Sequence, residues 1–271
     1  MKDYNKSSEY LICVDNDGTV MDTMLLKHKF AIAPAFFETY KVQDFDGEKM
    51  NHWLKKNLFT KNRGVNRFLA LDEMIDYLGI GSIDQSDYKT WLKNTNHMSI
   101  SSLKEELDKK PNSISLNLAY KWSMLVNDYL SNLEKPQIFN NAYDVLKKYH
   151  NIVDFVGVST ANIKALTSDW TEGKVIDFFK SLGSQEDGVK SLIISNLIKK
   201  GYKKENILMV GDANGDYIAA MDNNIKYFPM IPGKEADSWL ELDNAIEKLM
   251  NHNFDEEYQE KLLENYNKAL M

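Results

Sequence analysis

The chain has 271 residues, of which 43% are hydrophobic and 27% are charged, with 13 glycines and 5 prolines. This composition excludes a disordered or collagen-like chain and indicates a globular protein with one large domain or two unequal ones. Lysine and arginine number 33 against 40 aspartates and glutamates. The net charge of −7 argues against general attraction to nucleic acid or to anionic membranes.

Cys13 is the single cysteine, so the chain can form neither an internal disulfide nor a cysteine-rich metal site. The apolar run Tyr10–Val14 is shorter than the core of a secretory signal. The sequence also contains no apolar run of about 18 residues, the length needed to span a membrane. We therefore expect a cytoplasmic protein with no membrane partner.

The first predicted strand is Tyr10–Val14, which ends in the polar sequence DNDGT at residues 15–19. Similar apolar runs lie at 152–158 and 207–210 and end in Ser-Thr and Gly-Asp. Short apolar runs with polar ends are typical of strands buried on both faces of a parallel sheet. A weaker strand is predicted near 226–230, where Pro229 favours a strand end or a sheet edge.

Residues 22–136 show helical periodicity without convincing strands, for example around 68–78 and 116–133. We interpret this region as a helical insertion and expect its tryptophans, Trp53, Trp91 and Trp122, in its core.

From about residue 140, strands alternate with helices. One helix is predicted at 189–200 and ends at Gly201. Its expected buried stripe is Val189, Leu192, Ile193, Leu197 and Ile198. The acidic residues 255–257 are expected to begin a final amphipathic helix.

These patterns predict an α/β fold with a doubly wound parallel sheet, formed by residues 1–21 and 137–271. Residues 22–136 are expected to form a second, all-helical cap domain over the carboxyl ends of the strands.

Carboxylates cluster at the end of the first predicted strand, the place where open parallel sheets bind ligands. Asp15 and Asp17 are two residues apart, so their side chains lean to one side of the turn, and Gly18 allows that turn to be sharp. Two neighbouring carboxylates repel unless a cation or a proton separates them, which favours a hard ion such as Mg²⁺. Asp212 is the expected further ligand, so Asp15 and Asp212 must lie well within about 10 Å of each other.

A Ca²⁺ loop does not fit, because alignment on Gly18 places Cys13 at the first ligand position and Met24 where a glutamate belongs. The lysine-rich residues 199–204 flank a helix end, where cations favour the helix dipole. We therefore expect no nucleic-acid partner.

Four motifs in order resemble those of the haloacid dehalogenase superfamily, most of whose members are Mg²⁺-dependent phosphohydrolases. DNDGTV at 15–20 resembles the nucleophile motif, and Ser159 resembles the hydroxyl residue that ends the second strand. Lys190 resembles the lysine at a helix start, and GDANGD at 211–216 resembles the terminal Gly-Asp-x-x-x-Asp motif. The resemblance covers about 1–21 and 137–251.

The resemblance implies that Asp15 attacks phosphorus and forms an aspartyl-phosphate. Asp17 would protonate the leaving oxygen and then deprotonate the attacking water. Mg²⁺ would be held by Asp15, the backbone carbonyl of Asp17 and Asp212, and would offset the charge of the phosphate. Loop amides near Asn16 and Asp17 would add donors to the phosphoryl oxygens.

Ser159 and Lys190 would also hold the phosphoryl group, with Thr160 as the alternative to Ser159 one residue later in the strand register. A lysine at a helix start opposes the helix dipole, so we expect an anion beside Lys190. Asp216 is expected to orient Lys190 or a metal-bound water.

Arg63 and Arg67 are the only arginines in the chain and are four residues apart. If their segment is helical, both guanidinium groups lie on one helix face, where their forked donors suit carboxylate or phosphate. We hypothesise that one or both reach the leaving group of the substrate from the cap. A solvated helix face is the alternative.

These features favour a Mg²⁺-dependent phosphatase that acts on a small phosphorylated metabolite. Asp17 argues against a dehalogenase, because dehalogenation does not use a second acid at this position. A sugar phosphomutase of the same superfamily and a catalytically weak phospholigand-binding protein are the alternatives.

Overall fold

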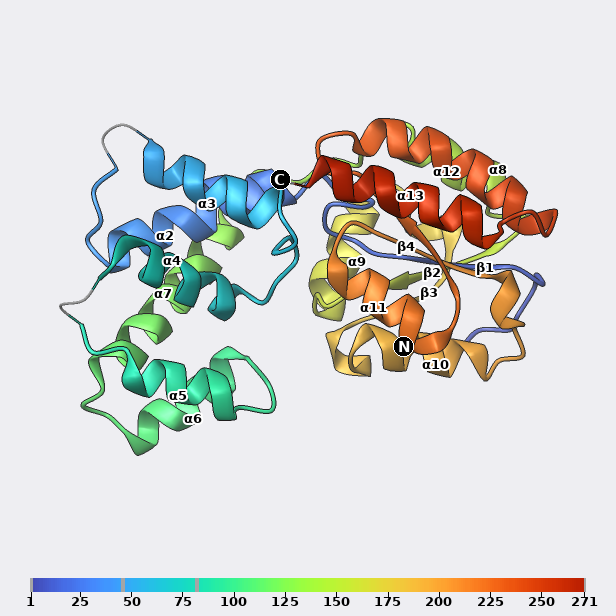
Figure 1. The fold of residues 1–271 in the computed structure, drawn as a ribbon. Coiled ribbons are helices and arrows are strands. Elements are labelled where there is room, and N and C mark those ends of the chain that lie inside the picture. The colour runs from blue at the N-terminus through green and yellow to red at the C-terminus, as the bar shows by residue number, and fades with distance from the viewer. Residues whose placement is uncertain (1, 45–46, 81–82, 271) are drawn as a thin grey trace. The chain divides into compact units, whose positions relative to one another are not determined.

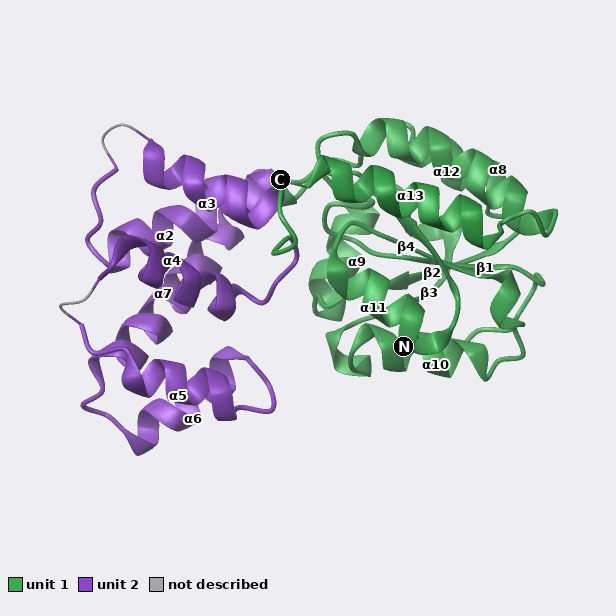
Figure 2. Ribbon diagram, viewed as in Figure 1, with its two compact units in different colours: residues 1–24, 59–63, 135–271 green, residues 25–58, 64–134 purple. Residues whose placement is uncertain are grey.

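The computed structural model describes residues 2–44, 47–80 and 83–270, and the chain divides by its contacts into two compact units (Figure 1, Figure 2). Unit 1 comprises residues 1–24, 59–63 and 135–271, and unit 2 comprises 25–58 and 64–134. The short segment Phe59–Arg63 therefore packs with unit 1, although its neighbours in sequence on both sides belong to unit 2. No helix in the described ranges is long and apolar enough to cross a bilayer.

Unit 1 contains a parallel five-stranded sheet with the order β3-β2-β1-β4-β5. Its strands are β1 (Leu11–Val14), β2 (Asp154–Val158), β3 (Phe179–Gly183), β4 (Ile207–Gly211) and β5 (Lys226–Pro229). The order reverses at β1, which pairs with β2 on one side and with β4 on the other. This arrangement confirms the predicted doubly wound α/β fold, and the carboxyl end of β1 is the position at which sheets of this order bind ligands.

Helices cover both faces of the sheet because side chains of successive strand residues point to opposite faces. Ile12 and Val14 face a core shared with α8 (Ala142–Tyr149), α9 (Ile163–Glu172) and α12 (Glu235–Met250). Leu11 and Cys13 face the core formed with α10 (Lys190–Ile198) and α11 (Asn214–Asn223). Figure 1 shows α8 and α12 on one side of the strands and α10 and α11 on the other.

The remaining elements of unit 1 are short 3-10 turns and the final helix. The turns are η2 (Ile176–Phe178), η3 (Gln185–Asp187) and η4 (Lys204–Asn206). Helix α13 (Glu256–Ala269) begins at Asp255, whose side chain accepts from the Tyr258 backbone N–H, and it packs on β5. The predicted C-terminal helix is thereby confirmed.

Two local predictions need correction. Strand β3 was not predicted, because Lys180 and the small residues around it break the apolar run that marked the other strands. In α10 the buried residues are Ile193, Ile194 and Leu197, whereas Val189 and Leu192 are exposed. The strand near 226–230 does lie at the sheet edge and ends at Pro229, as its proline predicted.

A buried carboxylate ties the N-terminal segment to the amino end of the sheet. Asp154 is fully buried and accepts hydrogen bonds from the backbone N–H groups of Ser7 and Ser8 at 2.9 and 3.0 Å. The hydroxyls of Ser7 and Tyr202 donate to it at 2.5 Å. These donors hold residues before β1 against β2.

Unit 2 is helical in its described residues. It contains the end of α1 (Met24–Lys27), the π-helix η1 (His28–Ile32), α2 (Ala33–Thr39), α3 (Glu48–Leu58), α4 (Arg67–Leu78), α5 (Ser86–Asn94), α6 (Ile100–Lys109) and α7 (Ile114–Ser131). Trp53, Trp91 and Trp122 lie in its core, as predicted. Trp122 donates to the carbonyl oxygen of Ile32, which links α7 to η1. This unit has a hydrophobic core of its own.

Candidate functional site

The DNDGT loop turns sharply at the carboxyl end of β1. The carbonyl oxygen of Asn16 accepts from the backbone N–H groups of Thr19, Val20 and Met21. Gly18 has φ +71° and its N–H donates to the carbonyl oxygen of Met21. A side chain at Gly18 would be strained by this φ value and would meet Asp212, so only glycine fits the turn.

Three buried carboxylates converge at the carboxyl ends of β1 and β4. Asp15 follows β1, Asp212 follows β4 and Asp216 lies in the first turn of α11. Each can offer one carboxylate oxygen such that all three oxygens lie within 4.8 Å of one another. Asp15 and Asp212 therefore satisfy the distance that a shared ion requires.

Lys190 lies between two of these carboxylates. Its Nζ is 2.8 Å from Asp15 Oδ1 and 2.5 Å from Asp216 Oδ1. Asp216 also accepts from the backbone N–H of Ala213 at 3.1 Å, which fixes the carboxylate at the helix start. The anions expected beside a lysine at the start of α10 are thus Asp15 and Asp216.

Arg63 reaches the third carboxylate from the segment Phe59–Arg63 of unit 1. Its Nε donates to Asp212 Oδ2 at 2.5 Å, and its Nη2 donates to Glu235 Oε1 at 3.2 Å. The carbonyl oxygen of Asp212 accepts from the hydroxyl of Tyr266 in α13. Sequence reasoning did not identify Glu235 or Tyr266, and their positions far along the chain gave no motif signal.

Burial is the largest single influence on the pKa values of these groups. It raises the pKa of Asp15 well above its ordinary value, with Lys190 acting in the opposite direction. Burial likewise raises the pKa of Asp212 to about 6, although Arg63 lowers it. For Lys190, burial acts to lower the pKa, but the attraction of Asp15 and Asp216 outweighs it and the pKa is raised.

Asp17 lies outside the three-carboxylate cluster and is partly exposed. The Thr23 hydroxyl donates to Asp17 Oδ1 at 2.6 Å, and the Asn16 amide donates to the same oxygen at 3.3 Å. These donors orient a carboxyl group that stays accessible, as an acid and base requires.

The side chain of Asn16 faces α9 and is fully buried. Its Oδ1 accepts from Trp170 Nε1 at 2.5 Å, and its Nδ2 lies 3.4 Å from Asp169 Oδ2. Any phosphate contact of Asn16 would therefore be made by its backbone N–H, and that contact remains a prediction.

Ser159 and Thr160 differ in burial at the end of β2. Ser159 is buried and its Oγ accepts from the backbone N–H of Ala161 at 3.1 Å, whereas Thr160 is exposed. The assignment of the phosphoryl contact to Ser159 remains a prediction.

Arg63 and Arg67 do not share a helix. Arg63 lies in a turn, and α4 begins at Arg67 after the N-cap residue Asn66. Arg67 belongs to unit 2 and donates from Nη1 to Asn127 Oδ1 at 2.9 Å. The condition for a common helix face, a helical segment from Arg63 to Arg67, is not met, because Gly64 and the cap interrupt the helical pattern. That one or both arginines reach the substrate remains a prediction.

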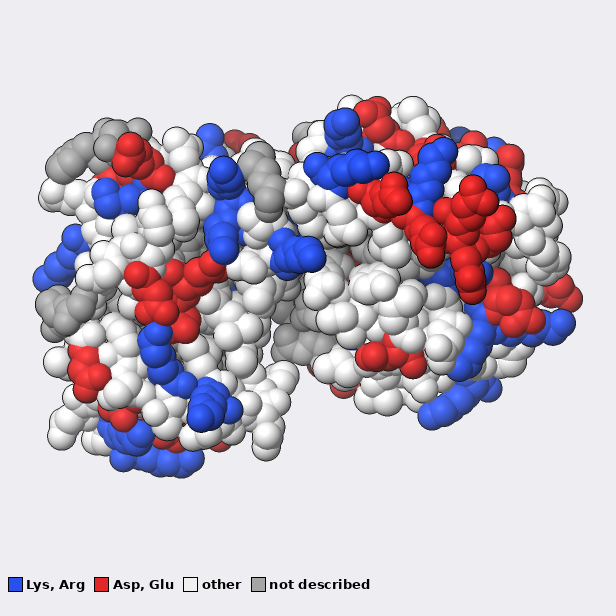
Figure 3. Space-filling view, viewed as in Figure 1, with Lys and Arg blue, Asp and Glu red and all other residues white. Residues whose placement is uncertain are grey.

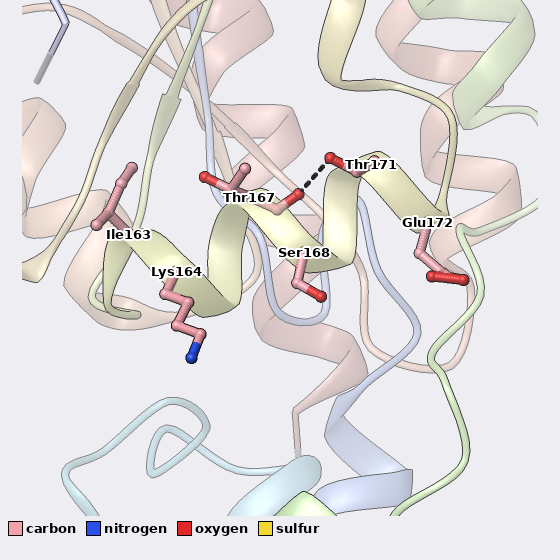
Figure 4. A pocket seen from close by; sticks show the side chains of 6 residues that line it. All are labelled: Ile163, Lys164, Thr167, Ser168, Thr171 and Glu172. Carbon is pink, nitrogen blue, oxygen red and sulfur yellow. Dashed lines mark hydrogen bonds between the residues drawn. The ribbon is translucent and has the colours of Figure 1, made fainter.

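The outer face of α9 carries an open hollow of about 440 Å³ (Figure 4). It is lined by Ile163, Lys164, Thr167, Ser168, Thr171 and Glu172. Figure 4 shows the dashed bond from the Thr171 hydroxyl to the carbonyl oxygen of Thr167. This single-helix hollow contains none of the predicted site residues, so we place the candidate site at the strand ends.

Across the visible face in Figure 3, acidic and basic side chains are interspersed.

The chemistry of the donor set fits a hard divalent cation. Three buried carboxylate oxygens within 4.8 Å provide oxygen ligands and excess negative charge. A cation at this position would also favour the ionised form of Asp15, which burial disfavours.

The fold brings a cluster of buried acids to the carboxyl edge of a parallel sheet, the edge at which α/β proteins of this class bind ligands. Residues 65–230, more than half of the chain, match the family model of haloacid dehalogenase-like hydrolases. The chain belongs to this family. The match includes Ser159, Lys190 and Asp212, while the DNDGT loop precedes it. Comparison with curated proteins gives no match.

Solved structures share the fold. A proposed phosphoglycolate phosphatase from Lactobacillus delbrueckii subsp. bulgaricus aligns with a TM-score of 0.58 at 14% identity, over 89% of this chain and 99% of that one. A predicted phosphoglycolate phosphatase from Haemophilus somnus aligns with a TM-score of 0.51 at 12% identity, over 83% of this chain and 87% of that one. Both similarities concern the fold, including its helical insertion.

Proposed function

We propose that this protein is a Mg²⁺-dependent phosphatase that hydrolyses a small phosphorylated metabolite. The observation that carries the proposal is the convergence of Asp15, Asp212 and Asp216 at one strand edge, with Lys190 Nζ 2.8 Å from Asp15. The family membership supports a hydrolase, and the names of the two structural relatives are consistent with a phosphomonoester substrate.

Asp15 is the proposed nucleophile, because it lies at the strand end beside the ammonium group of Lys190. Its attack on phosphorus would form an aspartyl-phosphate and release the alcohol of the substrate. Asp17, held by Thr23, would protonate that leaving oxygen and then take a proton from the attacking water. Lys190, Ser159 and the amides of the DNDGT loop would hold the phosphoryl oxygens.

Asp15, Asp212 and the backbone carbonyl of Asp17 would hold Mg²⁺. When bound, the ion supplies positive charge that offsets the repulsion between a carboxylate nucleophile and an anionic phosphate. Asp216 contacts Lys190 at 2.5 Å, so its proposed role is to orient that lysine. The helical unit 2 is the proposed cap that determines which substrates enter.

The test is a screen of phosphorylated metabolites for phosphate release with and without Mg²⁺. We expect wild-type turnover to require the ion. Asp15→Asn, which removes the nucleophile, and Asp17→Asn, which removes the acid and base, are each expected to lower turnover by roughly 100-fold or more. The exposed Asp222→Asn is the matched control and is expected to leave turnover unchanged.

Undiminished turnover in Asp15→Asn would contradict the covalent mechanism. A strict requirement for a sugar bisphosphate would instead indicate a phosphomutase. Absence of turnover by the wild type across the screen, together with tight binding of phosphorylated ligands, would favour a binding protein.

A further inference from the structure

Arg63 forms ion pairs with two acids beside the proposed site, and the pair with Asp212 is buried. Its side chain is 3% exposed and that of Asp212 is 2% exposed. Nε lies 2.5 Å from Asp212 Oδ2, and Nη2 lies 3.2 Å from Glu235 Oε1. The guanidinium group thus uses an oxygen of a proposed metal ligand.

The guanidinium group of Arg63 also lies beside Gly18 of the DNDGT loop, next to Asp212. A Cβ atom built on Gly18 would lie 2.7 Å from Arg63 Nη2 and closer still to Asp212 Oδ2. Gly18 directly follows Asp17, whose carbonyl oxygen is a proposed ligand. Arg63 therefore lies against both Asp212 and the backbone that would complete the coordination.

Two cations balance the buried acids here, and each bridges two of them. Lys190 contacts Asp15 and Asp216, and Arg63 contacts Asp212 and Glu235. A metal ion bound by Asp212 needs lone pairs on its carboxylate. The ion would also place a second positive charge beside Asp212, and since arginine cannot lose its charge by losing a proton, movement of its side chain relieves the repulsion.

We propose that Arg63 is an internal counter-ion that takes the place of the metal at Asp212 and leaves this carboxylate when Mg²⁺ binds. The inference rests on the proposed metal-dependent function. Glu235, at the first position of α12, provides a second partner that can retain the guanidinium group after the exchange. The exchange lowers the apparent affinity of the site for the metal.

The exchange also affects the segment Phe59–Arg63, which belongs to unit 1. Arg63 is the last residue of Phe59–Arg63, and the sequence on both sides of this segment belongs to unit 2. Metal binding therefore removes one of the two ion pairs that hold the end of this segment to unit 1.

The experiment follows the arginine side chains directly by NMR. Because the chain has only two arginines, a ¹⁵Nε–¹H spectrum of labelled protein contains two side-chain signals, and Arg63→Gln assigns them. In metal-free protein, Asp212→Asn is expected to shift the Arg63 signal and leave that of Arg67 in place. Titration of the wild type with MgCl₂ is likewise expected to shift the Arg63 signal and to leave the Arg67 signal in place.

Calorimetric titration with MgCl₂ alone measures the competition. Arg63→Gln is expected to tighten Mg²⁺ binding by roughly fivefold or more, the lower range of coupling between linked ligands. Arg67→Gln, the matched control in unit 2, is expected to leave the affinity unchanged, and Asp212→Asn to abolish binding. Circular dichroism of each variant checks that the fold is retained.

The outcomes separate the inference from the function on which it rests. An Arg63 signal that stays in place at Mg²⁺ saturation, or an unchanged affinity in Arg63→Gln, overturns the exchange and leaves the metal site intact. Binding by Arg63→Gln but not by the wild type supports the exchange. Binding by neither protein overturns both the exchange and the metal-dependent function.

Discussion

Buried carboxylates at the two ends of the sheet are satisfied in different ways. At the carboxyl end, Asp15 and Asp212 face the cations Lys190 and Arg63. At the amino end, Asp154 is held mainly by neutral donors. The first end should therefore respond to metal ions as well as to pH, and the second to pH.

The hydrogen bonds of Asp154 should make the free energy of unfolding depend on pH. Burial acts to raise its pKa, but hydrogen bonds from Ser7, Tyr202 and Ser8 outweigh burial, so the pKa lies below the ordinary value of 3.8. The ionised form is thus favoured by folding, and its stabilisation is present above pH 3.8 and lost as the pH falls through the lowered pKa. We expect Asp154→Asn to lower the free energy of unfolding at pH 7 by about 1–3 kcal/mol.

Urea unfolding at pH 7 and at about pH 3 checks this expectation. The difference between wild type and Asp154→Asn should shrink at the lower pH, because below pH 3.8 the unfolded wild type takes up a proton at this carboxyl group that the folded state, with its lowered pKa, resists. Asp222→Asn, on an exposed surface, should show no such difference at either pH. A difference that is constant with pH would contradict the role of ionisation.

The convergence of residues at the proposed site could be predicted in part from the sequence. Asp15, Lys190 and Asp212 were identified because parallel strand ends meet at one edge, and motif order places residues at that edge. The pairing of Arg63 with Asp212 could not be predicted, because it depends on the path of Phe59–Arg63 into unit 1. Local periodicity contains no information about that path.

At the scale of elements, close packing of α9 on β2 positions the DNDGT loop. A Cβ atom on Gly157 of β2 would lie 2.7 Å from Trp170 Cη2 and 3.1 Å from Leu182 Cδ2. The same Trp170 donates to Asn16 in the loop after β1. The absence of a side chain at Gly157 therefore allows the indole to reach the loop.

Gly157→Ala is expected to destabilise the protein by about 1–3 kcal/mol, because the added methyl group has no free space. The matched control is Gly215→Ala in α11, where an added Cβ meets no atom within 4 Å. That variant should be neutral or more stable by up to about 1 kcal/mol, since alanine favours helix. Thermal unfolding of both variants measures the contrast, and equal losses would contradict the packing argument.

Prediction of elements succeeded where hydrophobic patterns were strong. The helices at 68–78 and 116–133 appear as α4 and α7, and the three apolar strands are present. Strand β3 was missed because its burial alternates and Lys180 is exposed. Its strand conformation comes from pairing with β2, a contact between segments that a local pattern does not contain.

At the scale of the whole molecule, the ligands of the proposed ion come from two segments of unit 1 that are far apart in the sequence. Asp15 and Asp212 lie on either side of unit 2 in the sequence. An ion that binds the folded site and not the unfolded chain stabilises the folded state by mass action.

We therefore expect Mg²⁺ to raise the melting temperature of the protein and EDTA to reverse the effect. At 100 times the dissociation constant, the added stability is about 2.7 kcal/mol. Differential scanning calorimetry of Asp212→Asn should show no Mg²⁺-dependent shift, while Asp222→Asn should retain it. An equal shift in both variants would indicate ion binding elsewhere.

The central place of β1 in the sheet also bears on how the chain is made. The ribosome releases β1 before both of its neighbours, which begin only at Asp154 and Ile207. Throughout synthesis of the intervening helices this apolar strand has neither of its native partners, and unpaired strand edges of this kind promote aggregation. Nascent chains that end before β4 should therefore depend on chaperones for solubility.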